Sequence, residues 1–204
     1  MEKLYYKLNI SSENAIKSNV NIGWDGGERA KINLSMSQYF EPSWISYFRH
    51  LGMKMDTGLV FYKPSNYSNN IHVDPFEGKT WLGASVNIVA HPKHRDGKWD
   101  LYPDYIDDSY MTWYDPDSVK VERKFITEDN ITFDYLWADE KDAVEIQRCQ
   151  MGTDIYLVNT QIPHQIITNK FPRLCFALRG TYSAKCKSWK DVVDWFGEKG
   201  LMAE

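Results

Sequence analysis

The chain has 204 residues, of which 43% are hydrophobic and 25% charged, and its formal net charge is −4. This length is sufficient for one domain with a core of its own. The negative charge and the lack of clustered Lys and Arg argue against nucleic acid as a partner. No apolar run approaches the roughly 20 residues that cross a bilayer, so we expect no membrane association. Three cysteines without metal-ligand spacing, and a start without an apolar leader, favour a cytoplasmic location.

The first 56 residues are expected to form a mixed segment that supports the rest of a single domain. Residues 3–10 predict a strand, and residues 11–14 could cap a short helix. A second helix is predicted over Pro42–Leu51, because Pro suits the first helical turn and Gly52 follows the last. The buried side of this helix would consist of Trp44, Ile45 and Phe48.

From residue 57 the hydrophobic period changes to that of β-strands, which are short, rich in β-branched or aromatic residues and bounded by turn residues. A mainly β core is therefore predicted over residues 57–182, as a sandwich or barrel. A final helix is expected within 183–204, where Ser188 is a plausible N-cap. The predicted strands are Gly58–Tyr62, Asn70–Val73, Leu82–Ala90, Met111–Tyr114, Lys120–Ile126, Ile131–Leu136, Ala143–Arg148, Asp154–Asn159, His164–Thr168 and Arg173–Tyr182.

Residues 91–108 differ from their surroundings, since they contain two Pro, one Gly and many charges without a clear period. Long loops in compact domains are often lids or binding loops. His91 and His94 are spaced so that they could bind zinc, although the charged residues around them are more typical of a solvated loop.

The segment Ile71-His72-Val73-Asp74-Pro75 contains the most informative motif. Alternate residues of a strand point to the same face, so the side chains of His72 and Asp74 are expected to project together. His164 follows a proline at the predicted start of a later strand and is the candidate third ligand. Two histidines and one carboxylate on one face of a metal leave its other face open, which suits non-haem Fe(II).

A later strand, beginning at Arg173, alternates between two kinds of side chain. Arg173, Cys175, Ala177 and Arg179 would share one face, and leucine and phenylalanine would take the other. Burying an arginine costs free energy unless an anion pairs with its guanidinium group. A carboxylate ligand that binds the guanidinium in a bidentate manner would explain them.

This combination of His-x-Asp, a distal His and an Arg nine residues beyond it resembles the 2-oxoglutarate/Fe(II)-dependent dioxygenase superfamily. The resemblance covers residues 57–182 and implies a double-stranded β-helix, or jelly roll. It implies that His72, Asp74 and His164 bind iron and that the co-substrates are 2-oxoglutarate and O₂. The reaction implied is hydroxylation of an unactivated C–H bond with release of succinate and CO₂. Halogenating relatives lack the carboxylate, so the presence of Asp74 favours hydroxylation.

The same resemblance assigns the 5-carboxylate of 2-oxoglutarate to Arg173. Many relatives have Ser or Thr two residues later, where this chain has Cys175, so Arg179 stays a rival anchor. Tyr62 and Asn87 are weaker candidates for the co-substrate pocket, because both lie on strands that flank the His-x-Asp segment.

Two other functions stay open from the sequence. The chain could be a non-enzymatic, cupin-like jelly-roll protein that binds a metal or ligand, or a cupin-type metal enzyme that does not use 2-oxoglutarate. The substrate of the oxygenase, such as a small molecule or a peptide side chain, is not defined by the sequence, and neither is the oligomeric state. Trp81, Trp99, Trp113 and Tyr114 could line a substrate cleft, although aromatic residues in β folds more often belong to the core.

Overall fold

The structure is a computed structural model of the whole chain, and it describes most but not all of the residues. The described residues are 2–11, 15–16, 29–34, 36–74, 84–90, 108–128, 131–152, 154–181 and 186–203.

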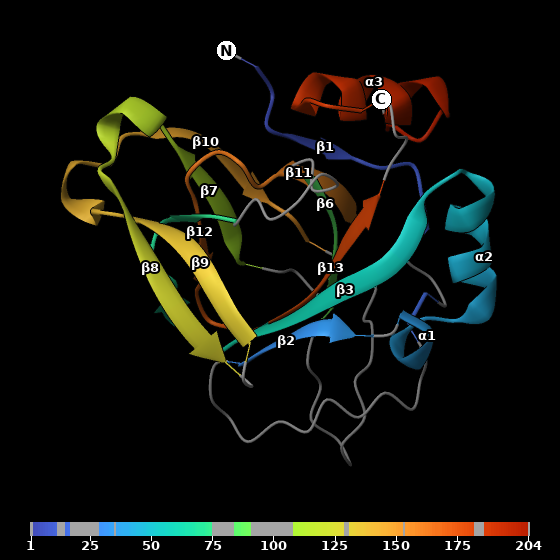
Figure 1. Cartoon of the computed structure of the whole chain (residues 1–204), viewed down its shortest axis with the longest axis horizontal. Helices are drawn as coiled ribbons and strands as arrows, with labels where there is room; N and C mark the ends of the chain where they lie inside the picture. Colours follow the sequence, from blue (N-terminus) through green and yellow to red (C-terminus); the bar gives the residue numbers. More distant parts are fainter. Residues whose placement is uncertain are drawn as a thin grey trace.

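Two antiparallel sheets form the body of the fold (Figure 1). The six-stranded sheet has the order β1-β11-β6-β13-β3-β2, and the seven-stranded sheet has the order β10-β7-β12-β5-β9-β8, with β4 paired to β12. The first sheet contains β1 (Tyr5–Lys7), β2 (Arg29–Leu34), β3 (Lys54–Lys63), β6 (Ala84–Ala90), β11 (Ile155–Asn159) and β13 (Arg173–Thr181). The second contains β4 (Tyr67–Ser68), β5 (His72–Val73), β7 (Tyr110–Tyr114), β8 (Val121–Glu128), β9 (Ile131–Ala138), β10 (Glu145–Gln150) and β12 (His164–Thr168). The predicted β-rich architecture is confirmed.

The strand pairings are nested along the chain. β3 pairs with β13, β5 with β12, β6 with β11 and β7 with β10. The first strand of this set thus pairs with the last, the second pairs with the last but one, and the same order continues inward. This order brings the His-x-Asp segment next to a strand that begins about ninety residues later.

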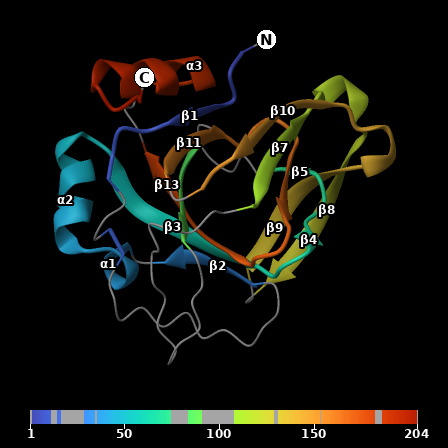
Figure 2. The same ribbon diagram turned by 180° about the vertical axis from the view of Figure 1, so that it is seen from behind.

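The helices gather on one side of the six-stranded sheet, and the seven-stranded sheet lies on the other (Figures 1 and 2). They are α1 (Met36–Tyr39), α2 (Pro42–His50) and α3 (Trp189–Glu198), with short 3-10 turns η1 (Pro116–Ser118) and η2 (Glu140–Asp142) in the connections of the second sheet. No helix in the described part of the chain combines the length and apolar character needed to span a membrane.

The two longer helices agree with the predictions from sequence. In α2, Trp44, Ile45 and Phe48 are the buried residues, and Gly52 follows with a positive φ of 91° that favours glycine. In α3, the Ser188 side chain accepts a hydrogen bond from the backbone N–H of Asp191.

Each of the ten predicted strands is present, and β12 has the predicted bounds. The sequence did not predict β2, β4 or α1. β2 is an edge strand with mixed polar and apolar residues, and β4 has only two residues, so neither has a clear alternating pattern. The possible helix cap at residues 11–14 lies largely outside the described residues.

Two hydrophobic cores lie on opposite faces of the six-stranded sheet. The outer core joins this sheet to α2 and α3, and it includes Leu174, Phe176 and Leu178 of β13. The inner core joins residues of both sheets, and Cys175 of β13 belongs to it. The predicted alternation of β13 is therefore confirmed for these residues. The inner core consists of Leu4, Val89, Met111, Trp113, Cys149, Met151, Val158 and Cys175.

Candidate metal centre

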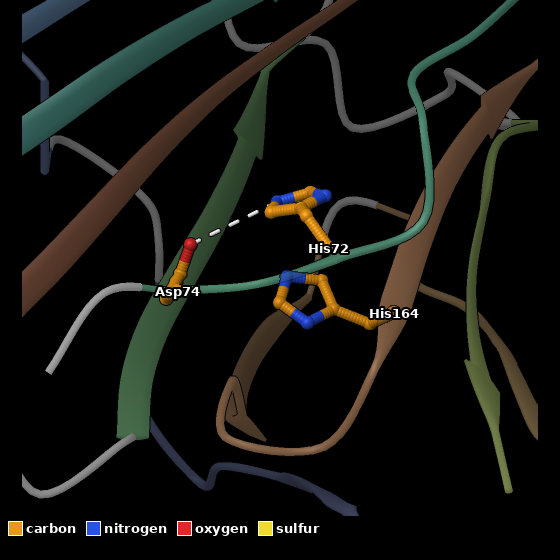
Figure 3. Close-up of side chains that lie close together, drawn as sticks. All are labelled: His72, Asp74 and His164. Carbon is orange, nitrogen blue, oxygen red and sulfur yellow. Dashed lines mark ion pairs between the residues drawn. The ribbon is translucent and has the colours of Figure 1, made fainter. Parts of the chain in front are cut away.

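His72, Asp74 and His164 come together between the sheets (Figure 3). His164, the first residue of β12, lies directly opposite His72 of β5 in the antiparallel register, so the two side chains share a face. Their ring centroids are 4.4 Å apart. Asp74 is two residues beyond His72, and its Oδ1 lies 3.8 Å from His72 Nε2. The potential ligand atoms all lie within 4.8 Å of one another, so the group could hold one metal ion.

The hydrogen bonds of the two imidazoles leave the same nitrogen of each ring for a metal. His72 Nδ1 lies 2.9 Å from the carbonyl oxygen of Asn70, and His164 Nδ1 lies 3.0 Å from that of Ile162. A carbonyl can only accept, so these bonds place the proton on Nδ1 and the lone pair on Nε2. Metal-binding histidines are commonly oriented in this way by a backbone carbonyl.

Burial keeps His72 in the neutral form that a metal requires. Desolvation, followed by the neighbouring His164, lowers the pKa of His72 to about 3. Protons therefore do not compete with a metal for this imidazole at neutral pH. Asp74 is buried beside it, and its backbone is fixed because its N–H donates to the Thr160 carbonyl at 3.1 Å and its carbonyl accepts from Gln161 Nε2 at 3.2 Å.

The segment that carries His72 is held against β12 by side chains that the sequence did not indicate. Asn69 Oδ1 accepts a hydrogen bond from the Ile166 N–H at 2.6 Å. Asn69 Nδ2 also lies 3.1 Å from His72 Nδ1, a contact that is not a hydrogen bond when Nδ1 carries the proton. Gln165 Nε2 donates to the Asn69 carbonyl at 2.7 Å. Asn69 lies between β4 and β5, Gln165 lies in the short strand β12, and both carry ordinary polar side chains, so no motif marks them.

Arg173 is buried at the start of β13, with 2% of its surface exposed. Its Nη1 donates to Ser109 Oγ at 3.3 Å and its Nη2 to Met151 Sδ at 3.1 Å, while Nε is buried without a partner. No described carboxylate forms an ion pair with it. A guanidinium that is withdrawn from water and only weakly bonded has the capacity to bind an anion.

The two weaker pocket candidates lie on opposite faces of the sheet. Tyr62 belongs to the outer core, against the helices, and burial raises its pKa to about 12. The register of β3 with β13 pairs it with the outward-facing Leu174, so Tyr62 lies on the face of the sheet that is turned away from the second sheet. Asn87 pairs with Ala177 of β13 and is buried, and its Oδ1 accepts a hydrogen bond from Ser85 Oγ at 2.7 Å. Asn87 stays a candidate on the inner face.

Two other aromatic candidates form hydrogen bonds to residues of other strands. Trp113 lies opposite His164, is fully buried and donates from Nε1 to the Asn159 carbonyl at 2.7 Å. The Tyr114 hydroxyl donates to Gln165 Oε1 at 2.7 Å. Arg179 lies opposite Thr57, six residues along β13 from Arg173, and its side chain is outside the described part. Also outside it are Trp81, His91, His94, Trp99 and nearly all of the 91–108 loop.

Comparison with known proteins found no family model, no curated protein and no solved structure that matches this chain.

Proposed function

We propose that this chain is a 2-oxoglutarate- and Fe(II)-dependent oxygenase that hydroxylates an unactivated C–H bond of a small molecule or a peptide side chain. The observation that carries the proposal is the group His72, Asp74 and His164, whose donor atoms lie within 4.8 Å of one another in a buried site. Two imidazoles and one carboxylate match the donor set of non-haem Fe(II) oxygenases.

The nested strand pairing supports the finer part of the fold prediction. In a jelly roll, eight strands in two sheets are wound so that the first pairs with the last and the inner pairs follow. Here β3, β5, β6 and β7 pair with β13, β12, β11 and β10 respectively. We therefore propose a double-stranded β-helix in which β5 and β12 present the metal ligands.

In the proposed reaction, His72 and His164 would bind the metal through Nε2 while their protonated Nδ1 atoms donate hydrogen bonds to the carbonyls of Asn70 and Ile162. These two hydrogen bonds would hold the rings in their metal-binding orientation. Asp74 would supply the third, anionic ligand. When bound, iron with 2-oxoglutarate and O₂ supplies the oxidising power, and succinate and CO₂ leave as co-products.

Arg173 would bind the distal carboxylate of 2-oxoglutarate, since it offers a buried guanidinium with an unused Nε donor. Such a fixed charge would orient the co-substrate so that its other end faces the metal. Burial between the sheets would exclude water from the reacting atoms. We also propose that the protein acts in the cytoplasm.

Anaerobic addition of Fe(II) and then 2-oxoglutarate tests the proposal. The wild type should give the weak visible charge-transfer band of a chelated co-substrate, and His72→Ala or His164→Ala should abolish it. His50→Ala, at an exposed histidine in the last turn of α2, is the matched control and should keep the band.

A wild-type protein that gives no band would contradict the oxygenase and leave a metal- or ligand-binding jelly-roll protein as the alternative. Loss of 2-oxoglutarate binding in Arg179→Ala but not in Arg173→Ala would show that the anchor is Arg179.

A further inference from the structure

The corner between β11 and β12, residues 159–164, holds two of the three proposed metal ligands. His164 is its last residue, and the carbonyl of Ile162 orients the ring of His164. Asp74 lies far earlier in the sequence, but both polar groups of its backbone form hydrogen bonds to this corner. The position of Asp74 relative to His164 therefore depends on the β11–β12 corner.

The two backbone hydrogen bonds of Asp74 have different kinds of partner. The Asp74 N–H donates to the Thr160 carbonyl at 3.1 Å, which is a backbone pairing of the kind that strands make. β5 ends at Val73, and the Asp74 carbonyl accepts instead from a side chain, Gln161 Nε2, at 3.2 Å. Gln161 thus supplies the donor that a paired strand would supply from its backbone.

The backbone of Gln161 is itself fixed by the corner. Its N–H donates to Asn159 Oδ1 at 2.9 Å, which closes a turn. Asn159 is buried, its N–H donates to the Leu4 carbonyl at 2.9 Å, and its carbonyl accepts from Trp113 Nε1 at 2.7 Å. The Gln161 side chain therefore extends toward Asp74 from a backbone that several hydrogen bonds hold in place.

The hydrogen bond from Gln161 acts on the Asp74 carboxylate through the backbone. The side chain of Asp74 is short, so the place of its backbone decides where the carboxylate lies, and Oδ1 is 3.8 Å from His72 Nε2. Metal–ligand distances tolerate deviations of only about 0.2 Å. A small displacement of the Asp74 backbone would therefore weaken one of the three ligands.

We infer that Gln161 is a positioning residue of the metal centre, which holds the Asp74 carboxylate in place for the metal without binding the metal itself. The inference rests on the metal centre of the proposed function, because Gln161 acts only through the ligand Asp74. Residues that orient metal ligands from outside the coordination sphere typically change the affinity for the metal by about 10- to 100-fold.

Titration of the protein with Co(II), followed by its visible absorption, tests the inference without any co-substrate. Gln161→Met keeps the length of this half-buried side chain and removes its donor, so the affinity for Co(II) should fall by about 10- to 100-fold. The bands of the bound Co(II) should also shift toward those of Asp74→Ala, because the carboxylate is held less firmly. Gln150→Met, at an exposed glutamine at the end of β10, is the matched control and should bind Co(II) as the wild type does.

A double-mutant cycle with Asp74→Ala separates positioning from a general effect on the corner. Asp74→Ala removes the carboxylate and keeps the backbone carbonyl to which Gln161 donates. In this background, Gln161→Met should change the affinity for Co(II) by less than about twofold. A loss as large as that in the wild-type background would overturn the inference, since Gln161 would then act on His164 or on the whole corner.

Unchanged Co(II) affinity in Gln161→Met would also overturn the inference and leave the proposed function intact. Far-UV circular dichroism checks the fold of each variant, and Gln161→Ala replaces Gln161→Met if the longer apolar side chain prevents folding. A wild type that binds no Co(II) would overturn both the inference and the proposed metal centre. A wild type that binds Co(II), loses affinity in Gln161→Met and gives no charge-transfer band with 2-oxoglutarate would support the inference and contradict the oxygenase.

Discussion

The two faces of the six-stranded sheet bury different kinds of side chain. Toward the helices, β13 presents Leu174, Phe176 and Leu178 to a core of apolar and aromatic residues. Toward the second sheet, the same strand presents Arg173 and Cys175, and buried polar residues lie on neighbouring strands. Apolar burial stabilises a fold, whereas buried polar groups cost free energy unless they are paired. The outer face therefore stabilises the fold, and the inner face carries the buried guanidinium of Arg173, for which we propose a role in binding.

The largest effect on stability is expected on the outer face. Phe176 is 1% exposed and packs edge-on against Phe40, with ring centroids 5.5 Å apart. Phe176→Ala should reduce the free energy of unfolding by about 3–5 kcal/mol, because it removes apolar contacts and leaves a cavity. Urea denaturation measures this change.

Val144→Ala, at a residue that is 55% exposed, is the control and should change the free energy of unfolding by no more than about 0.5 kcal/mol. A loss below about 1 kcal/mol in Phe176→Ala would contradict the role given to the outer core.

The inner face should make the stability of the metal-free protein depend on pH. The pKa of His72 is lowered to about 3 by burial, whereas an unfolded histidine has a pKa near 6.5. Between these values the unfolded chain binds a proton that the folded chain does not, so stability falls as the pH falls below about 6.5. Between pH 6.5 and pH 4.5, the titration of His72 alone should lower the free energy of unfolding by roughly 2–3 kcal/mol.

Urea denaturation of the metal-free wild type and His72→Gln at several pH values isolates that contribution. The variant should lose less stability than the wild type over this range, and His50→Gln should follow the wild type. Parallel pH profiles for the wild type and His72→Gln would show that burial does not hold His72 neutral.

The smallest effect on stability, and a clear effect on binding, is expected for Arg173→Met. Replacing a buried charge by an apolar side chain of similar length is often neutral or stabilising. The free energy of unfolding should therefore fall by less than about 1 kcal/mol, while the affinity for 2-oxoglutarate falls by about 10- to 100-fold. Denaturation and calorimetry on the same sample measure both. A variant that unfolds readily but still binds 2-oxoglutarate when folded would show that Arg173 is structural.

The sequence predicted the elements of this fold better than their pairing. The alternation of polar and apolar residues in β13 distinguished its two faces, because every second side chain of a strand points to the same face. The spacing of His72 and Asp74 likewise placed them on one side. The partner of each strand was not predictable, because pairing between distant strands depends on long-range packing that no local pattern encodes.

The neighbouring residues Tyr62 and Lys63 show how unknown pairing leaves the face of a side chain undecided. A shift of one residue exchanges the two faces of a strand, and the predicted strand ended at Tyr62. The residue chosen for the co-substrate pocket therefore lies in the outer core, and its neighbour Lys63 faces the interior. Asn69 and Gln165 were also missed, because their role depends on the contact between the His72 segment and β12.

Anomalous diffraction from crystals grown anaerobically with Fe(II) and 2-oxoglutarate tests the central claim most directly. The account predicts one iron ion bound by Nε2 of His72, Nε2 of His164 and a carboxylate oxygen of Asp74, with 2-oxoglutarate extending from the iron toward Arg173. Iron bound elsewhere, for example at His91 and His94, with the three proposed ligands free of metal, would contradict it.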